Sequence, residues 1–369
     1  MVESWEEKVY TRRSYATGDP VIDAKILELT APFEDVQDRR LVAELVVSAY
    51  RLGREKATTL DLKIINSAVK ELRYAFKIFK PYRRVKKVAT FGSARVSHQH
   101  PAYKMAKDFG RFMSEAGWSV ITGAASGIMK AGHEGAGREA SFGLNIRLPF
   151  EQEANPVIAA DKKLITCKYF FTRKLLFIRE SHATALFPGG FGTLDEGFES
   201  LTLVQTGKSD PRPIVFVDLP GKGFWKPLLN FIGRDLVKQK MVSPHDPSIY
   251  QVTTSAEEAA RMILDFYAVY HSIRYTKEWT VLRLHRPLSY KAVALLNREF
   301  KDILSDGEIS QGPAVAEEKD EPDLELLTRL ILRFNRRDYG RLSQMIHRIN
   351  QLGSSQAGDS GARKGKRRG

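Results

Sequence analysis

The stretch Phe187-Pro188-Gly189-Gly190-Phe191-Gly192-Thr193-Leu194-Asp195-Glu196 follows a predicted β-strand, Ala183 to Phe187, and opens a predicted helix, Leu194 to Thr206. Glycines without a Cβ atom let backbone N–H groups approach an anion, and the N-terminus of a helix adds positive potential. Thr193 can cap this helix or donate its hydroxyl group. The stretch therefore predicts a phosphate-binding loop between a strand and a helix.

Two better-known nucleotide motifs do not fit this loop. No Gly-Lys-Ser/Thr follows the glycines, which excludes a Walker P-loop, and the spacing differs from the dinucleotide fingerprint GxGxxG. A glycine-rich turn that only joins strand to helix is the simpler alternative. Glu196 favours a site, because it lies about one helical turn beyond the loop and keeps a carboxylate close to it.

Short β-rich runs alternate with helical segments from Val85 onward, which is typical of a doubly wound, mainly parallel sheet. The predicted strands are Val85 to Phe91, Trp118 to Thr122, Leu144 to Leu148, Ala183 to Phe187, Ile214 to Val217 and Ile249 to Val252. The predicted helices are Tyr103 to Ala116, Ile128 to Glu139, Thr172 to Ser181, Leu194 to Thr206, Trp225 to Lys238 and Ala256 to Tyr270. We expect an α/β fold of the Rossmann-like type.

Two other strand ends and one helix start carry candidate ligand-binding residues. Gly92 and Ser93 follow the first strand, and the loop from Gly123 to Gly127 follows the second. Ligands of open α/β sheets bind at the carboxyl ends of the strands, so these loops can meet in one crevice. Arg173 and Lys174 begin the helix before the glycine-rich loop and offer a phosphate-binding fork and a point charge. Loop geometry and a solvated helix face are the alternatives.

Residues 188–196 match the pattern PGGxGTxxE, with Arg173-Lys174 ahead of it at the expected distance, and this resembles the LONELY GUY (LOG) family, often mislabelled as lysine decarboxylases. The resemblance is specific from Lys87 to Thr206 and weaker to Tyr270. It implies a Rossmann-like homodimer that hydrolyses the N-glycosidic bond of a nucleoside 5'-monophosphate. The substrate would resemble AMP or a cytokinin riboside monophosphate, and the products would be free base and ribose 5-phosphate.

The resemblance also implies the role of each site residue. Arg173 and Glu196 would be the catalytic pair. The substrate-binding residues would be Gly92, Ser93, Gly123, Gly127, Lys174, Gly189, Gly190, Gly192 and Thr193. One loop departs from the family pattern GGGxxGxM, because Ala124 and Ala125 replace two glycines. Added methyl groups could restrict the approach of the nucleotide, so a non-catalytic nucleotide-binding or carrier protein is the leading alternative.

The 369 residues divide into four predicted segments. Residues 1–82 form a helical N-terminal extension, residues 83–275 the catalytic domain, residues 276–352 a mostly helical C-terminal extension, and residues 353–369 a disordered basic tail. The formal net charge of +14 favours anionic ligands. Nonspecific contact with nucleic acid through the tail, around Arg363 to Arg368, is a third possibility.

No cofactor or metal is expected, because His98, His100, His133 and His182 do not form a ligand cluster. Tyr169 and Phe170 could stack on a base, although aromatic residues near a helix start more often belong to a core. Asp195 and Glu199 are assigned to a solvated helix face. The single cysteine, Cys167, favours a reducing compartment, and with no secretory signal or membrane-spanning stretch we expect a cytoplasmic protein.

Overall fold

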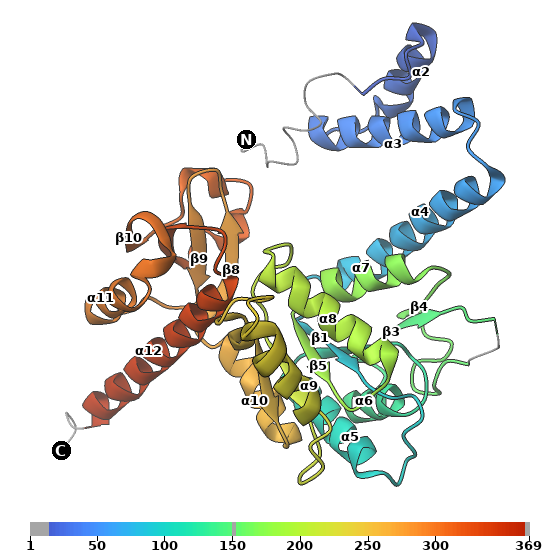
Figure 1. Ribbon diagram of the computed structural model, residues 1–369. Helices are drawn as coiled ribbons and strands as arrows, with labels where there is room; N and C mark the ends of the chain where they lie inside the picture. The colour runs from blue at the N-terminus through green and yellow to red at the C-terminus, as the bar shows by residue number, and fades with distance from the viewer. Residues whose placement is uncertain (1–14, 150–152, 366–369) are drawn as a thin grey trace. The chain divides into compact units, whose positions relative to one another are not determined.

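The computed structural model describes residues 15–149 and 153–365, and the chain forms two compact units, Met1–Lys70 and Glu71–Gly369 (Figure 1). The first unit is helical, with α2 (Pro20–Thr30), α3 (Val36–Arg54) and most of α4 (Thr59–Phe79). Asp19 and Asp35 cap α2 and α3 by accepting hydrogen bonds from N–H groups of the first turn. Helix α4 ends in the second unit, so the unit boundary lies inside a helix.

The second unit contains a seven-stranded parallel sheet with the order β4-β3-β2-β1-β5-β6-β7. Its strands are β1 (Lys87–Phe91), β2 (Ser119–Thr122), β3 (Ser141–Ile146), β4 (Leu164–Cys167), β5 (Ala183–Leu186), β6 (Ile214–Val217) and β7 (Tyr250–Thr253). The predicted Rossmann-like α/β fold is confirmed. All six predicted strands are present, whereas β4 at the edge of the sheet was missed.

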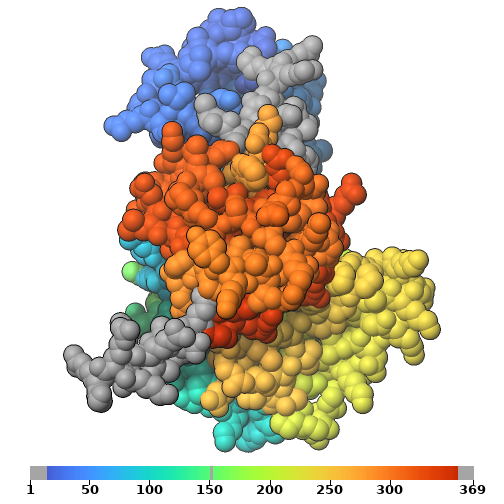
Figure 2. Space-filling model, turned by 90° about the vertical axis from the view of Figure 1, so that its left-hand side faces the viewer, coloured from blue at the N-terminus to red at the C-terminus, as the bar shows by residue number. Residues whose placement is uncertain are grey.

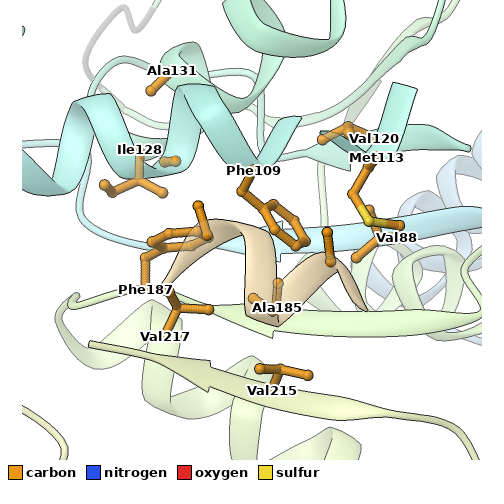
Figure 3. Packing of buried hydrophobic residues seen from close by; sticks show 14 of the residues in the cluster. Val88, Phe109, Met113, Val120, Ile128, Ala131, Ala185, Phe187, Val215 and Val217 are labelled. Carbon is orange, nitrogen blue, oxygen red and sulfur yellow. The ribbon is translucent and has the colours of Figure 1, made fainter. Parts of the chain in front are cut away.

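The sheet is apolar on both faces, as parallel sheets covered by helices are. Val88, Val120 and Val215 point into one hydrophobic cluster, while their neighbours Ala89, Ile121 and Phe216 point into another. Figure 3 shows the first cluster, in which strand residues such as Ala185 and Val217 lie near Phe109 and Met113 of α5. Two buried layers of side chains hold the strands in register. The carboxyl ends of the strands together form one edge of the sheet.

The helices of this core are α5 (Pro101–Glu115), α6 (Ile128–Ala136), α7 (Phe170–Glu180), α8 (Phe191–Gln205), α9 (Lys226–Phe231) and α10 (Ala256–Phe266). Short helical turns cover Lys80–Tyr82, Asp246–Ile249 and, as a π-helix after α9, Ile232–Val237. Ala75 and Phe79 of α4 are buried in the same cluster as Leu176 and Phe177 of α7. The C-terminal end of α4 thus belongs to the α/β core.

The segment after residue 275 differs from the prediction, because it is not mostly helical. Its strands β9 (Thr280–Leu284), β10 (Leu304–Gly312) and β11 (Thr328–Phe334) join β8 (Tyr270–Tyr275) in a four-stranded antiparallel sheet of order β10-β11-β9-β8. Helices α11 (Tyr290–Glu299) and α12 (Tyr339–Gly365) and short turns at Lys301–Ile303, Ala316–Glu318 and Pro322–Leu324 complete it. A separate hydrophobic cluster fills this part. Strand β10 is mostly exposed, so its polar sequence lacks the apolar pattern of a buried strand.

The predicted disordered tail is also helical over much of its length, since α12 continues to Gly365. Leu342, Ile346 and Ile349 bury one face of this helix, and the packed segment continues into the tail. Lys366, Arg367 and Arg368 lie outside the described residues, so contact with nucleic acid stays a prediction.

Among residues 15–149 and 153–365, no helix is long and apolar enough to cross a membrane. Figure 2 shows residues of the C-terminal sheet on the face turned toward the viewer.

Candidate active site

Three loops meet at the carboxyl edge of the central strands, because β1 lies between β2 and β5 in the sheet. The loop after β1 is joined to the other two through Ser93. The Ser93 N–H donates to Pro188 O at 3.0 Å, and the Ile128 N–H donates to Ser93 O at 3.0 Å. The predicted convergence of these loops is thus present in the structure.

A cavity of about 590 Å³ lies between these loops and the start of α7. It is lined by Phe91, Gly92, Ser93, Ala94, Arg95, Gly123, Met129, Arg173, Phe177, Gly190, Phe191, Gly192, Thr193, Leu194 and Glu196. Eight of the eleven predicted site residues line it, namely Gly92, Ser93, Gly123, Arg173, Gly190, Gly192, Thr193 and Glu196. The glycines and hydroxyl residues among them come from all three loops. The volume suits a small organic ligand.

The glycines of the site fall into two groups. A Cβ atom added to Gly190 or Gly192 would meet no atom within 4 Å, so these two positions face open space. An added Cβ at Gly189 would overlap Thr193, and one at Gly127 would overlap the backbone of Ser93 and Ala94. Gly127 also has φ +63°, a conformation that favours glycine. Gly189 and Gly127 are absent from the cavity lining. Close packing of the loops explains why glycine occupies these two positions.

The N-terminus of α8 is open toward the cavity. Its N-cap residue, Gly190, has no side chain to accept hydrogen bonds from the first turn. The hydroxyl-bearing residue of this turn, Thr193, lines the cavity and is otherwise buried. Uncapped N–H groups and the helix dipole make such a terminus a binding site for an anion. The predicted phosphate loop thus has the backbone arrangement that phosphate binding needs.

Glu196 is the buried acidic group of the cavity, with 3% of its surface exposed. Both carboxylate oxygens are buried and lack a hydrogen-bond partner among the described residues. The nearest cations are Lys174, whose Nζ lies 3.8 Å from Oε2, and Arg173, whose terminal nitrogen lies 4.0 Å from Oε1. Burial raises the pKa of Glu196 to about 7, against the opposing charges of Lys174 and Arg173. Such a group can change its protonation near neutral pH.

Arg173 approaches Glu196 from the first turn of α7. Its guanidinium lies 4.8 Å from the centre of the Phe170 ring, and its Nε has no hydrogen-bond partner in the described part of the chain. Burial lowers the pKa of Arg173 below its ordinary value, and the charge of Glu196 opposes this effect. The guanidinium stays charged, because its ordinary pKa is far above neutrality. Unused donors beside the cavity suit an oxygen-rich ligand.

Lys174 lies outside the cavity lining and forms ion pairs on the helix surface. Its Nζ lies 2.6 Å from a carboxylate oxygen of Glu199 and 2.9 Å from one of Asp195. These two acidic residues were assigned to a solvated face, and the structure adds Lys174 as their partner. Lys174 therefore acts on the site through the charge it places near Glu196.

The two alanines of the second loop do not line the cavity. Ala124 and Ala125 are buried, and Ala124 adopts a left-handed conformation with φ +61°. Hydrogen bonds hold this conformation: the Ala124 N–H donates to Thr122 Oγ1, and Ala124 O accepts from the backbone and side chain of Asn155. The side chain of Asn155 also contacts His133, whose pKa burial lowers to about 4. Both alanine side chains are therefore buried outside the cavity lining.

Several lining residues were not singled out in the sequence. Phe191, the variable position of the motif, is 92% exposed at the edge of the cavity, and Arg95 and Met129 adjoin the predicted loops. Their place directly beside the motifs was the available signal. Of the two aromatic residues considered at this helix start, Phe170 is exposed and Tyr169 is half-buried, so neither belongs to the buried core. Within the described ranges, no group of three or more His, Cys, Asp or Glu side chains could hold a metal.

Comparison with known proteins gives a consistent family. Residues 122–263 match the family model described as "Possible lysine decarboxylase", the description under which the LOG family is often labelled. Cytokinin riboside 5'-monophosphate phosphoribohydrolase LOG1 of Arabidopsis thaliana is 30% identical over 29% of this chain and 48% of its own length. A probable enzyme of the same description, LOGL2 of Oryza sativa subsp. japonica, is 25% identical over 32% and 47%. The chain spans about half the length of the curated relatives it matches.

Solved structures with a similar chain include two proteins connected with the molybdenum cofactor. The molybdenum cofactor carrier protein of Chlamydomonas reinhardtii is 18% identical, with a TM-score of 0.34, over 49% of this chain and 99% of that chain. The molybdenum cofactor binding protein of Rippkaea orientalis is 18% identical, with a TM-score of 0.32, over 49% and 94%.

Proposed function

We propose that this LOG-family chain is a phosphoribohydrolase that cleaves the N-glycosidic bond of a nucleoside 5'-monophosphate, AMP-like or a cytokinin riboside monophosphate. One observation carries the proposal. Glu196 places two buried, unpartnered carboxylate oxygens in a cavity that the uncapped N-terminus of the same helix, α8, also lines. A phosphate at the helix and a ribose at the carboxylate are adjoining parts of a nucleotide.

The reaction needs a carboxylate at the reacting sugar. Breaking the bond between C1' and the base nitrogen leaves positive charge on the ribose ring, and an ionised Glu196 stabilises this charge. The bonding electrons pass to the base. The oxygen of a water molecule then bonds to C1' while Glu196 accepts one of the water protons, which it later releases to solvent, and the departing base nitrogen takes up one proton from solvent. The products are the free base and ribose 5-phosphate.

The remaining residues position the substrate. The N–H groups at the start of α8, with Gly190, Gly192 and Thr193, bind the 5'-phosphate. Arg173 contacts the ribose or phosphate and keeps Glu196 oriented. Binding of the remote phosphate holds C1' near the carboxylate, which lowers the barrier through orientation. Phe191 at the edge of the cavity is suited to stack on the base.

The activity is tested with a panel of nucleoside 5'-monophosphates and the matching unphosphorylated nucleosides. Chromatography measures the free base, and a coupled assay measures ribose 5-phosphate. We expect base release from monophosphates only, and its loss in E196A. The control variant E199A removes a nearby carboxylate that lies beside the cavity but is absent from its lining, and it should retain activity.

The same experiment separates hydrolysis from nucleotide binding alone. Binding of AMP measured by calorimetry, without release of base from any member of the panel, would replace the hydrolase by a nucleotide-binding or carrier protein. The buried position of the Ala124 and Ala125 methyl groups supports hydrolysis over this alternative, because neither group narrows the cavity.

We further propose a cytoplasmic homodimer, in line with the family. Exposed apolar side chains on α7 and α8, namely Phe170, Phe171, Leu175 and Phe198, support a second copy as their cover. Light scattering of the purified chain tests this state, and a monomer at micromolar concentration would contradict it.

A further inference from the structure

A carboxylate from α4 holds the start of α7. Glu71 Oε1 accepts a hydrogen bond from the Lys168 N–H at 2.8 Å, and Oε2 accepts one from the Thr172 hydroxyl at 2.6 Å. Lys168 precedes the helix, whereas Thr172 lies in its first turn and is fully buried. One side chain therefore binds both sides of the point at which α7 begins.

Helix α7 has no N-terminal cap of its own. Its N-cap residue, Tyr169, makes no side-chain capping bond, and the first backbone bond of the helix, from Arg173 N–H to Tyr169 O, is long at 3.5 Å. The first N–H groups of a helix need acceptors, and negative charge near this end is favourable. Glu71 supplies the charge and two hydrogen bonds from outside the helix.

The clamped turn carries the cations of the candidate site. Arg173 directly follows Thr172, and Lys174 comes next, so both side chains leave the backbone that Glu71 holds. Their distances to the Glu196 carboxylate, 4.0 and 3.8 Å, are longer than a hydrogen bond. A small shift of this turn would therefore change which of the two cations contacts Glu196 or a ligand.

We propose that Glu71 is a positioning residue for Arg173, so that the helix entering from the N-terminal extension sets the geometry of the catalytic pair. The inference rests on the proposed hydrolysis. Glu71 acts through the first turn of α7 and is absent from the cavity lining.

A purely structural role for Glu71 predicts the same effect from any loss of contact between α4 and α7. Such a contact exists elsewhere on the same pair of helices, where the Arg179 guanidinium lies 4.3 Å from the centre of the Phe76 ring. It is well away from the helix start. The variant F76L thus loosens this pair of helices without removing the clamp and serves as the matched control.

The experiment compares wild type with E71A, E71Q, T172V, F76L, R173A and the double variant E71A/R173A, at saturating AMP or whichever monophosphate is cleaved. We expect E71A to lower kcat by about 10-fold, since small misplacements of catalytic groups are costly. E71Q keeps one acceptor and should recover to within about 3-fold of wild type, T172V should fall between them, and F76L should stay within about 2-fold. In the R173A background, E71A should cause almost no further decrease in kcat, because the side chain that Glu71 positions has already been removed.

Equal kcat in E71A and wild type, or a full additional loss in the double variant, would overturn the positioning role. Where E71A does not fold, T172V and E71Q carry the same comparison. Wild type without any base release would instead defeat the proposed function. In that case the same variants are titrated with AMP by calorimetry, where a loss of affinity in E71A that disappears in the R173A background supports the inference and equal affinities refute it.

Discussion

The guanidinium of Arg173 lies 4.0 Å from the Glu196 carboxylate without forming a hydrogen bond to it. The two groups thus attract each other and still leave room for a third. Because the carboxylate is buried and incompletely neutralised, its ionisation is costly, which raises its pKa to about 7. This raised pKa gives the first two predictions.

Activity should rise with pH. The reaction requires ionised Glu196, so kcat/KM for a nucleoside 5'-monophosphate should increase from pH 5.5 to 8 with an apparent pKa near 7. Lys174 is the largest charge that lowers this pKa, so K174M should move the profile toward higher pH. Steady-state rates over this range check both statements. A flat profile in wild type would contradict the assignment of Glu196.

The ionisation of Glu196 should also make the free energy of unfolding decrease as the pH rises. The pKa of Glu196 is raised in the folded state, so the folded protein binds a proton at this side chain more tightly than the unfolded chain does. The stabilisation of the fold by this proton is fully present below about pH 4.5 and is lost as the pH rises through about 7. The neutral variant E196Q should therefore match wild type near pH 4.5 and exceed it at pH 8 by up to about 3 kcal/mol. Urea unfolding at both pH values measures this difference, with E199Q, at a half-buried carboxylate on the same helix, as the control.

Two glycines of the phosphate loops should respond differently to alanine. G190A places a methyl group in open space, so the fold should keep its melting temperature while AMP binds about 10-fold more weakly. G127A meets the backbone of Ser93 and Ala94 at a positive φ and should cost about 2 kcal/mol or more. Thermal unfolding and calorimetric titration of both variants decide this. Equal destabilisation by the two changes would show that Gly190 also serves packing.

The C-terminal sheet should depend on one buried carboxylate. Glu318 accepts hydrogen bonds from Arg283 at 2.6 Å and Arg329 at 3.1 Å, and all three side chains are buried. E318A would leave two buried guanidinium groups without this partner, at a cost of about 3–5 kcal/mol. Hydrogen exchange of β9 and β11 should accelerate, while kcat should stay unchanged. The exposed control E325A should have little effect on either.

The parts of the chain with simple local signals were predictable. β1, β2, β5 and β6 are apolar on both faces and short, so their parallel arrangement followed from the alternation with helices. The glycines and Thr193 indicated the start of a helix, which the structure has as α8. Strand β4 was missed because its edge position leaves Leu164 half-buried and Thr166 exposed, which weakens the apolar pattern.

Contacts between distant segments had no local signal. Strand β10 lies at the edge of the second sheet, and its exposed Ser, Asp, Glu and Gln residues give no apolar alternation that would predict a strand. Glu71 contacts Thr172 across 101 residues, so no spacing rule joins them. The support of Ala124 by Asn155 is equally non-local. Such pairs become visible only when the chain is folded.

The course of α4 limits how the chain can be shortened. A fragment beginning at residue 83, where composition changes, would lack Ala75 and Phe79, which complete one side of the parallel sheet. It would also lack the acceptor for Lys168 and Thr172. The smallest fragment that keeps these contacts therefore starts upstream of Glu71, and gene fusions or deletions chosen from the motif alone would remove them.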